Sequence, residues 1–242
     1  MTEPLRVAHY LNQFFGGLGG EENASQGPRL MDGAVGPGQA LKNAMKTRGD
    51  VVATAICGDN YFSEKMDEAI HEIVEGLIPY RPDVFIAGPA FNAGRYGVAC
   101  GALCQAVQEK LGIPVVTGMY QENPGVGLYR KNVYIVTTDK SVKGMADAIS
   151  KMVNLVVKLA EKEDIGKPDE EGYFARGLLK RALSDRTAAQ RATDMLIAKL
   201  QGKPFQTELP LPDFGQVQPA AAVKDLSASK ICLVTDGGLV PA

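Results

Sequence analysis

The chain has 242 residues, of which 45% are hydrophobic and 22% are charged. This length and composition can bury a complete hydrophobic core, which excludes a wholly disordered protein. The 26 Lys and Arg residues against 28 Asp and Glu give a formal net charge of −2, and basic residues never occur in runs of more than two. We therefore expect neither a nucleic acid nor an anionic membrane as a partner.

The targeting and redox features of the sequence indicate the compartment. The longest apolar runs have the length of strands, far short of the roughly 20 residues of a membrane-spanning helix. Residues 1–6 lead directly into a polar-interrupted strand, without the apolar region of a signal peptide. Four cysteines are too few for a disulfide scaffold in a chain of this size. We expect a soluble, reduced, cytoplasmic α/β protein.

Short β-rich runs alternate with segments of helical periodicity along most of the chain. Strands are predicted at residues 5–11, 51–57, 84–88, 113–118 and 133–137. Apolar positions at helical spacing predict helices over residues 66–78, 98–111 and 142–159. Ser63 is the expected N-cap of the first of these helices, and Gly112 the C-cap of the second. The alternation predicts an α/β fold with a doubly wound, mostly parallel sheet of about five strands, flavodoxin-like or Rossmann-like.

The pattern changes after about residue 162. Residues 161–171 are acidic and contain Gly and Pro, and a further helix is predicted from about 184 to 200. Four prolines then fall between positions 204 and 219, and a strand with a Gly-Gly turn begins at residue 231. We predict a substrate-pocket domain at 1–202, a Pro-rich linker at 203–229, and the start of a second, truncated α/β domain at 230–242.

Four loops follow the predicted strands, at residues 14–23, 57–61, 88–97 and 118–125, and each mixes glycine with polar residues. Ligands of an open parallel sheet bind outside the carboxyl ends of its strands. Any one of these loops alone would be an ordinary tight turn, but four together favour a binding site. The candidate substrate-binding residues are Glu21, Glu22, Asp59, Asn60, Asn92, Arg95, Tyr96, Tyr120, Glu122 and Asn123.

Arg95 is the basic residue of the third loop and precedes a predicted helix, whose N-terminus also favours anions. A small carboxylate could bind its guanidinium in bidentate fashion, with Asn92 beside it. The alternative is a structural ion pair of Arg95 with Asp59, Glu21 or Glu22. These three acids could instead hold an ammonium group, or be solvated residues of turns.

Other chemistries find little support in the residues. The spacing G-x-G-x-x-G fails at Glu22 and at Leu41, so a nucleotide is not expected. Cys100 and Cys104 lie four residues apart among apolar neighbours, which predicts buried, reduced side chains without a metal. Cys57 lacks a partner thiol in the sequence, although it ends a predicted strand. We assign no catalytic residue and no metal ligand, and the residues alone name no reaction.

Several long stretches do resemble one family, the selenoprotein B subunit of glycine/sarcosine/betaine reductases. The similar segments are residues 7–22, 57–62, 87–101, 117–126 and 170–177. The resemblance covers nearly the whole chain. It implies a part in the reductive cleavage of a C–N bond in glycine, sarcosine, betaine or a relative. It also implies a partner subunit with a pyruvoyl group that holds an amine substrate, and a small selenoprotein A that accepts the carboxymethyl group.

The nucleophile that the resemblance implies is a selenocysteine followed by paired cysteines, in a second domain well past residue 242. A selenolate suits this displacement because it is ionised at neutral pH and more nucleophilic than a thiolate. This chain lacks that motif, so we expect no cofactor in it and no turnover by it alone.

Three interpretations remain open. The chain could be the amino-acid-pocket half of a reductase B subunit, a non-catalytic module that captures a small amino acid or betaine, or an assembly scaffold whose crevice is vestigial. Ligand binding by the chain separates the first two from the third.

Overall fold

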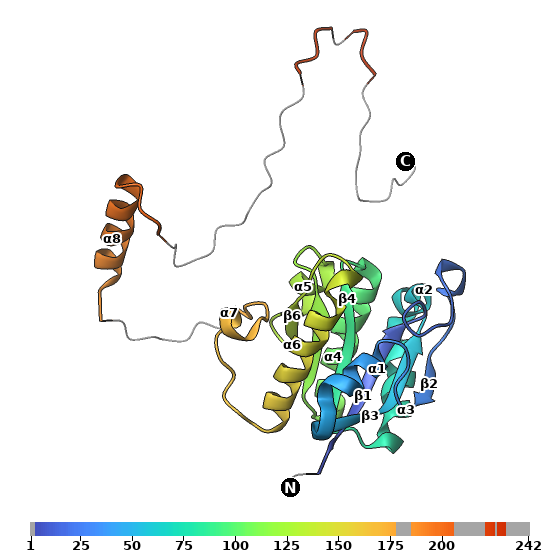
Figure 1. Cartoon of the computed structure of the whole chain (residues 1–242). Helices are drawn as coiled ribbons and strands as arrows, with labels where there is room; N and C mark the ends of the chain where they lie inside the picture. Colours follow the sequence, from blue (N-terminus) through green and yellow to red (C-terminus); the bar gives the residue numbers. More distant parts are fainter. Residues whose placement is uncertain (1–2, 178–184, 206–220, 226, 231–242) are drawn as a thin grey trace. The chain divides into compact units, whose positions relative to one another are not determined.

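The computed structural model describes residues 3–177, 185–205, 221–225 and 227–230. The chain divides into two units, residues 1–180 and 181–242. The first unit contains a six-stranded sheet with the strand order β2-β3-β1-β4-β5-β6, shown with its helices in Figure 1. The strands are β1 (Leu5–Asn12), β2 (Arg29–Asp32), β3 (Gly49–Cys57), β4 (Val84–Phe91), β5 (Val115–Met119) and β6 (Tyr134–Thr137).

Five of these strands run parallel, in the order β3-β1-β4-β5-β6. They are the five strands predicted from the sequence, which confirms the doubly wound, mostly parallel sheet. The sixth strand, β2, was not predicted, and it pairs antiparallel with β3 at the edge of the sheet. Three of its four residues are exposed, so β2 lacks the apolar pattern that reveals a buried strand.

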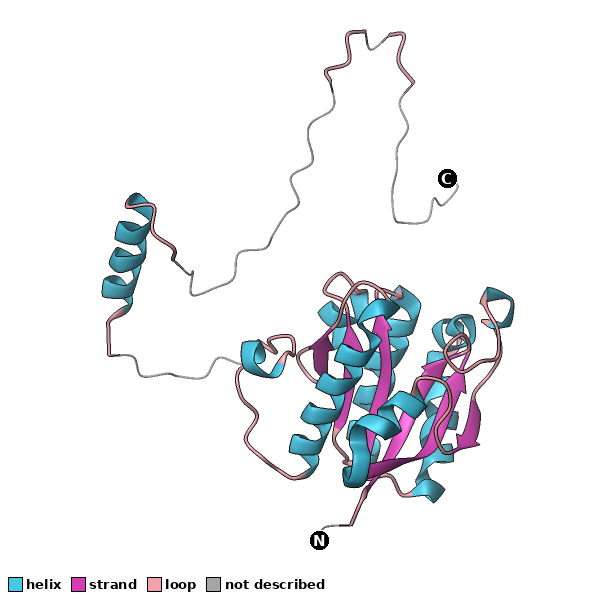
Figure 2. Ribbon diagram, viewed as in Figure 1, coloured by secondary structure: helices cyan, strands magenta, loops and turns pink. Residues whose placement is uncertain are grey.

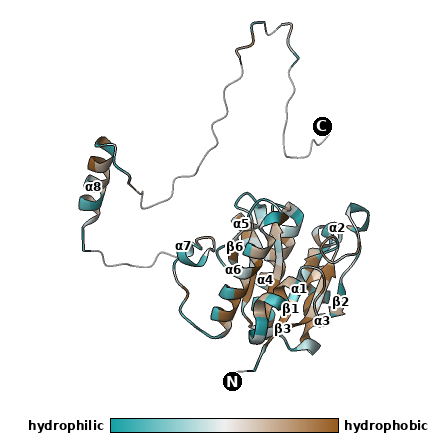
Figure 3. Ribbon diagram, in the orientation of Figure 1, coloured by the Kyte–Doolittle hydropathy of each residue, from teal (hydrophilic) through white to brown (hydrophobic). Residues whose placement is uncertain are grey.

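Helices cover both faces of this sheet (Figure 2). The helices of the first unit are α1 (Gly38–Met45), α2 (Asp59–Glu64), α3 (Met66–Leu77), α4 (Gly94–Leu111), α5 (Pro124–Tyr129), α6 (Met145–Ala160) and α7 (Pro168–Glu171). One core cluster contains buried residues of α1 and α6, and the other contains buried residues of α2, α3, α4 and α5. Figure 3 shows the hydrophobic residues concentrated along the strands, with polar residues on the outer faces of the helices.

Two predicted helix ends have different outcomes. Gly112 is the C-cap of α4, with a left-handed φ of 68°, as predicted. Ser63 is not an N-cap: it lies inside α2, where its Oγ donates a hydrogen bond to the Asp59 carbonyl at 2.7 Å. The N-cap of α3 is Lys65. The error arose because the chain forms a short helix directly after β3, before the longer amphipathic helix begins.

The connections of the parallel strands create a switch point between β1 and β4. The chain passes from β1 through α1 to β3, and from β3 through α2 and α3 to β4 on the other side of β1. Counting parallel strands alone, this is the 2-1-3-4-5 order of flavodoxin-like folds. The chain after β1 passes through β2 to α1 on one face of the sheet, and the loop after β4 leads to α4 on the other.

The second unit contains α8 (Ala188–Leu200), whose N-cap Thr187 forms a capping box with Gln190. This is the helix predicted from about residue 184, and it belongs to the second unit. The predicted domain boundary at 202 stays a prediction. The strand predicted at 231–235 lies outside the described residues, as does much of the predicted linker. Across the described ranges, we find no helix with the length and apolar character needed to cross a bilayer.

Close packing of α4 on α5 generates a prediction about stability. A Cβ atom added at Gly101 would overlap the ring of Tyr129, whereas one added at Gly127 would meet nothing within 4 Å. We expect Gly101→Ala to lower the free energy of unfolding by about 1–3 kcal/mol, as overpacking does. Gly127→Ala is the matched control, and it should be neutral or stabilise by up to about 1 kcal/mol. Urea denaturation measures both, and equal effects would contradict this packing.

Candidate functional site

A pocket of about 530 Å³ opens at the carboxyl ends of the strands, at the switch point between β1 and β4. It is built by the loops that follow β1, β4 and β6, together with the first residue of α2. Its lining consists of Asn12, Gln13, Phe14, Phe15, Gly20, Glu21, Asp59, Ala90, Phe91, Asn92, Ala93, Lys140, Ser141 and Val142. This pocket lies at the edge of the sheet where the sequence predicts a binding site, and its volume is in the range of small-molecule pockets.

A larger hollow of about 680 Å³ runs beside α6 and α7. Its lining is dominated by charged side chains that can neutralise one another, as Lys158 and Glu171 do at 2.7 Å. We assign no ligand to it.

Asp59 is the most unusual residue of the switch-point pocket. Its side chain is buried, with 7% of the residue exposed, and Oδ2 accepts a hydrogen bond from Asn12 Nδ2 at 2.9 Å. Its Oδ1 is also buried and has no hydrogen-bond partner. Burial raises the pKa of the Asp59 carboxyl above its usual range, against the lowering effects of the Asn12 hydrogen bond and the Arg95 charge. A buried, unpartnered carboxyl oxygen in a pocket is typical of a ligand-binding group.

Aromatic side chains form an apolar wall of the same pocket. Phe14 is 63% exposed, while Phe15 packs against Phe91 with ring centroids 6.4 Å apart. Phe91 also has a left-handed φ of 51°, a strained conformation for a residue with a side chain. Exposed aromatic surface and backbone strain both occur preferentially where a protein binds something.

The charged groups around the pocket are arranged in pairs. Arg95 bonds to Glu21 Oε1 at 2.6 Å and to the Asn60 side chain, so the structure contains one of the ion pairs left open by the sequence. Arg95 does not line the pocket. The pocket's basic side chain is Lys140, which lies 3.7 Å from Glu122 and over the ring of Tyr120.

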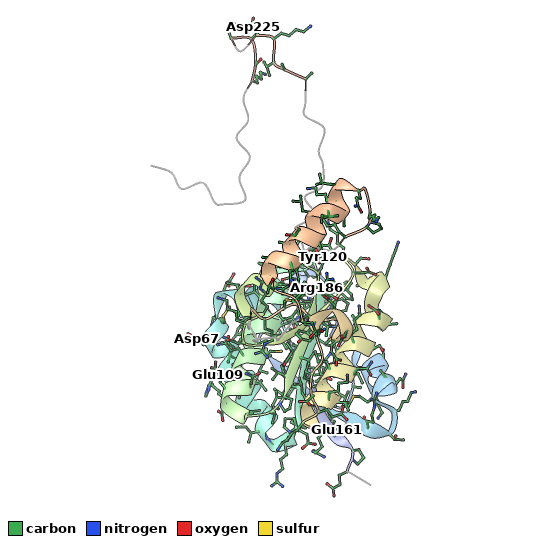
Figure 4. The ribbon with its side chains drawn as sticks, turned by 90° about the vertical axis from the view of Figure 1, so that its left-hand side faces the viewer. Asp67, Glu109, Tyr120, Glu161, Arg186 and Asp225 are labelled. Carbon is green, nitrogen blue, oxygen red and sulfur yellow. The ribbon has the colours of Figure 1, made fainter. Side chains whose placement is uncertain are left out.

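The predicted site residues fall into three groups. Glu21, Asp59 and Asn92 line the pocket. Arg95, Tyr120 and Glu122 contact the lining residues Glu21 and Lys140, and Asn60 bonds to Arg95. Figure 4 shows Tyr120 at the end of the unit opposite Glu161, as expected for a residue that follows β5.

The third group supports the loops. Tyr96 is completely buried, with its ring centroid 6.0 Å from that of Tyr10. Asn123 caps α5 and donates hydrogen bonds to the carbonyls of Phe91 and Ala93 at 3.0 and 3.1 Å. Glu22 accepts a hydrogen bond from the Gly20 N–H at 2.7 Å and does not line the pocket.

Sequence reasoning missed several lining residues. Asn12 is the buried last residue of β1 and Gln13 follows it, and this polar pair at the end of an apolar strand was a usable signal. Lys140 and Ser141 lie in the polar loop after β6, which is not among the four strand-to-helix loops predicted to form the site.

The three thiols of the described residues are buried and free, as predicted for Cys100 and Cys104. Burial, followed by the charge of Asp59, raises the pKa of Cys57 to about 12. Burial also raises the thiol pKa values of Cys100 and Cys104. None of the three is a thiolate at neutral pH, so none is an activated nucleophile. The same ranges contain no group of three or more His, Cys, Asp or Glu residues suited to a metal.

The fold is that of a doubly wound α/β protein, with a pocket at its switch point. Residues 4–242 match the family described as glycine/sarcosine/betaine reductase selenoprotein B (GRDB). The chain belongs to this family. No solved structure gives a significant match.

Curated relatives agree with this assignment. The chain is 57% identical over 237 residues to the glycine reductase complex component B subunit gamma of Carboxydothermus hydrogenoformans, covering 98% of this chain and 54% of the relative. Identity is 51% to the sarcosine reductase complex component B subunit beta of Peptoclostridium acidaminophilum, with the same coverage. It is 44% to the betaine reductase complex component B subunit beta of that organism, covering 96% and 53%. The chain thus spans about half the length of these relatives.

The raised pKa of Asp59 predicts how its substitution changes stability. Between the ordinary carboxyl pKa of about 4 and the raised value, the folded state holds a proton that the unfolded chain releases. Stability is therefore lost as the pH rises through this window. Asp59→Asn removes the penalty, so its melting temperature should exceed that of the wild type by a few degrees at pH 7, and the gain should shrink toward pH 4.

Thermal melts followed by circular dichroism test this expectation. Glu22→Gln, which neutralises an exposed acid in a neighbouring loop, is the control and should show no such gain. A destabilised Asp59→Asn would mean that the carboxylate is structural.

Burial of the thiols predicts slow alkylation. In the native chain at pH 8, Cys57, Cys100 and Cys104 should remain unlabelled by iodoacetamide, and all three should react after denaturation. Peptide mass spectrometry measures each site separately. Rapid native labelling of Cys57 would show a reactive thiol beside Asp59 and would reopen its role in chemistry.

Proposed function

We propose that this chain forms the substrate-binding part of component B of a glycine, sarcosine or betaine reductase, and that the switch-point pocket takes a small amino acid or betaine. The observation that carries the proposal is the unpartnered, buried carboxyl oxygen of Asp59 in a pocket that also contains a basic side chain. The names of the relatives support the substrate class, since they are components of glycine, sarcosine and betaine reductase complexes.

The pocket has complementary groups for both ends of such a ligand. Asp59 and Glu21 suit the positively charged nitrogen, and Lys140 with the Ser141 hydroxyl suits the carboxylate. The rings of Phe15 and Phe91 suit N-methyl groups and can also attract the cation through their faces. A volume of about 530 Å³ leaves room for the ligand and for a reacting group from elsewhere.

The group that binds the ligand carboxylate has two candidates. The sequence predicts Arg95, whose guanidinium is bonded to Glu21 and Asn60 and would have to exchange a partner. Lys140 lines the pocket and has only a weak ion pair at 3.7 Å. An exposed ion pair contributes about 0–1 kcal/mol. Either Arg95 or Lys140 could therefore leave its present acidic partner to bind a ligand carboxylate. We favour Lys140 because it is already at the pocket.

Burial raises the pKa values of the three described thiols, so they are protonated at neutral pH. Under this proposal, the nucleophile must therefore be a different group. The family suggests a selenocysteine elsewhere in a longer protein, and the relatives are about twice the length of this chain. We propose the pyruvoyl-containing subunit and the small selenoprotein A as partners, with the chain inactive on its own. Its residues would bind and orient the amine while the nucleophile comes from outside the pocket.

Isothermal titration calorimetry of the 242-residue chain with glycine, sarcosine and betaine tests the proposal. We expect binding of at least one ligand, weakened about tenfold or more by Lys140→Ala, since a charge-assisted hydrogen bond is lost. Lys143→Ala, an exposed lysine outside the pocket lining, is the matched control and should bind as the wild type does.

The outcomes separate the alternatives. Weakening by Arg95→Ala with Lys140→Ala unaffected would assign the carboxylate to Arg95. Absence of binding by any ligand, in a chain that melts cooperatively, would favour the scaffold interpretation.

A further inference from the structure

We infer that Asp59 makes the switch-point pocket selective for amines that keep at least one N–H, so that a fully N-methylated nitrogen binds far more weakly. This inference rests on the proposed function, because it concerns the ligand of the same pocket. It names one specificity-determining side chain and the feature of the ligand that this side chain detects.

The first step is that the Asp59 carboxylate is held in place. Asn12 Nδ2 donates to its Oδ2 at 2.9 Å, and the Asp59 N–H donates to Gln13 Oε1 at 2.9 Å. Asn12 is itself oriented, because its Oδ1 accepts the Phe15 N–H at 3.0 Å. The amide of Asn12 therefore cannot exchange its oxygen and nitrogen, and it presents a donor to Asp59. A pre-organised acceptor of this kind loses little freedom when a ligand binds.

The second step is that one oxygen of this carboxylate lacks a donor. Oδ1 is buried and has no hydrogen-bond partner among the described residues. Arg95 is bonded to Glu21 and Asn60 and acts on Asp59 through its charge alone. An ionised carboxylate has about four acceptor positions, and the Asn12 amide donates to one of them at Oδ2. A hydrogen bond with the Gln13 side chain also lowers the pKa of the Asp59 carboxyl, and further acceptor positions remain open. One oxygen of the carboxylate therefore has no donor from the described residues, and a donor on a ligand in the pocket that Asp59 lines could supply it.

The third step is the chemistry of the ligand nitrogen. A primary, secondary or tertiary ammonium can donate a charge-assisted N–H···O bond to Asp59, but a quaternary ammonium has no hydrogen to donate. It would leave a desolvated carboxylate oxygen unpaired. Sites built to bond an N–H reject analogues that lack it for this reason.

The other walls of the pocket do not make this distinction. Attraction of a cation to the rings of Phe15 and Phe91 needs no N–H. A pocket of about 530 Å³ is not limited by one added methyl group. We therefore assign to Asp59 the discrimination between ammonium groups that have an N–H and those that have none.

The experiment is a methylation series: glycine, sarcosine, N,N-dimethylglycine and betaine, titrated into the 242-residue chain at pH 7 by calorimetry. Every step adds one methyl group, but only the last step removes the final N–H. The last step therefore separates the effect of the hydrogen bond from the effect of ligand size. We expect Kd to change within about threefold at each of the first two steps and to rise at least about tenfold at the last.

Asp59→Asn is the decisive variant. The fixed donor of Asn12 attracts the side-chain oxygen of the new Asn, which turns its NH2 toward the ligand in place of an acceptor. The ratio of Kd for betaine to Kd for N,N-dimethylglycine should fall to within about threefold. Glu22→Gln, outside the pocket, should keep the wild-type ratio.

Each outcome decides between the claims. Betaine binding as tightly as N,N-dimethylglycine to the wild type, or an unchanged ratio in Asp59→Asn, would overturn the inference and leave the proposed function standing. Failure of all four ligands to bind would overturn both.

Discussion

The reversal of strand order between β1 and β4 is the constraint on which the site depends. The chain after β1 passes through β2 to α1 on one face of the sheet, and the loop after β4 leads to α4 on the other. Two neighbouring loops that diverge in this way cannot close over the carboxyl ends of their strands. The cavity of this chain lies at that place, and the loop sequences decide its chemistry.

Several residues around the cavity have features that do not stabilise the fold but suit ligand binding. Asp59 has a buried oxygen without a partner, Phe91 has a left-handed backbone, and Phe14 exposes an aromatic ring. The unpartnered oxygen and the left-handed backbone each cost free energy in the isolated chain, and all three residues line one pocket. Local conflicts of this kind are expected at functional sites, because elsewhere a sequence is consistent with its fold.

The fold was largely predictable because burial leaves a periodic trace. The apolar runs identified the five parallel strands, and helical spacing identified the faces of α3, α4 and α6. The failures occurred where that trace is absent. The strand β2 is mostly exposed and is defined by its pairing with β3, and Ser63 has the composition of a cap but lies within a two-turn helix. Pairing and helix starts of this kind depend on partners distant in sequence.

The sequence by itself determined that the strand-to-helix loops meet at one edge of the sheet, because the carboxyl ends of parallel strands share that edge. It also determined the family, through long matching segments. Only the tertiary structure decided which loop residues face the pocket. It placed Lys140 in the lining and Arg95 outside it, and it joined Asn12 to Asp59 across 47 positions of sequence. Loops have no periodicity that fixes the direction of a side chain, so these choices depend on contacts that form only when the sheet is assembled.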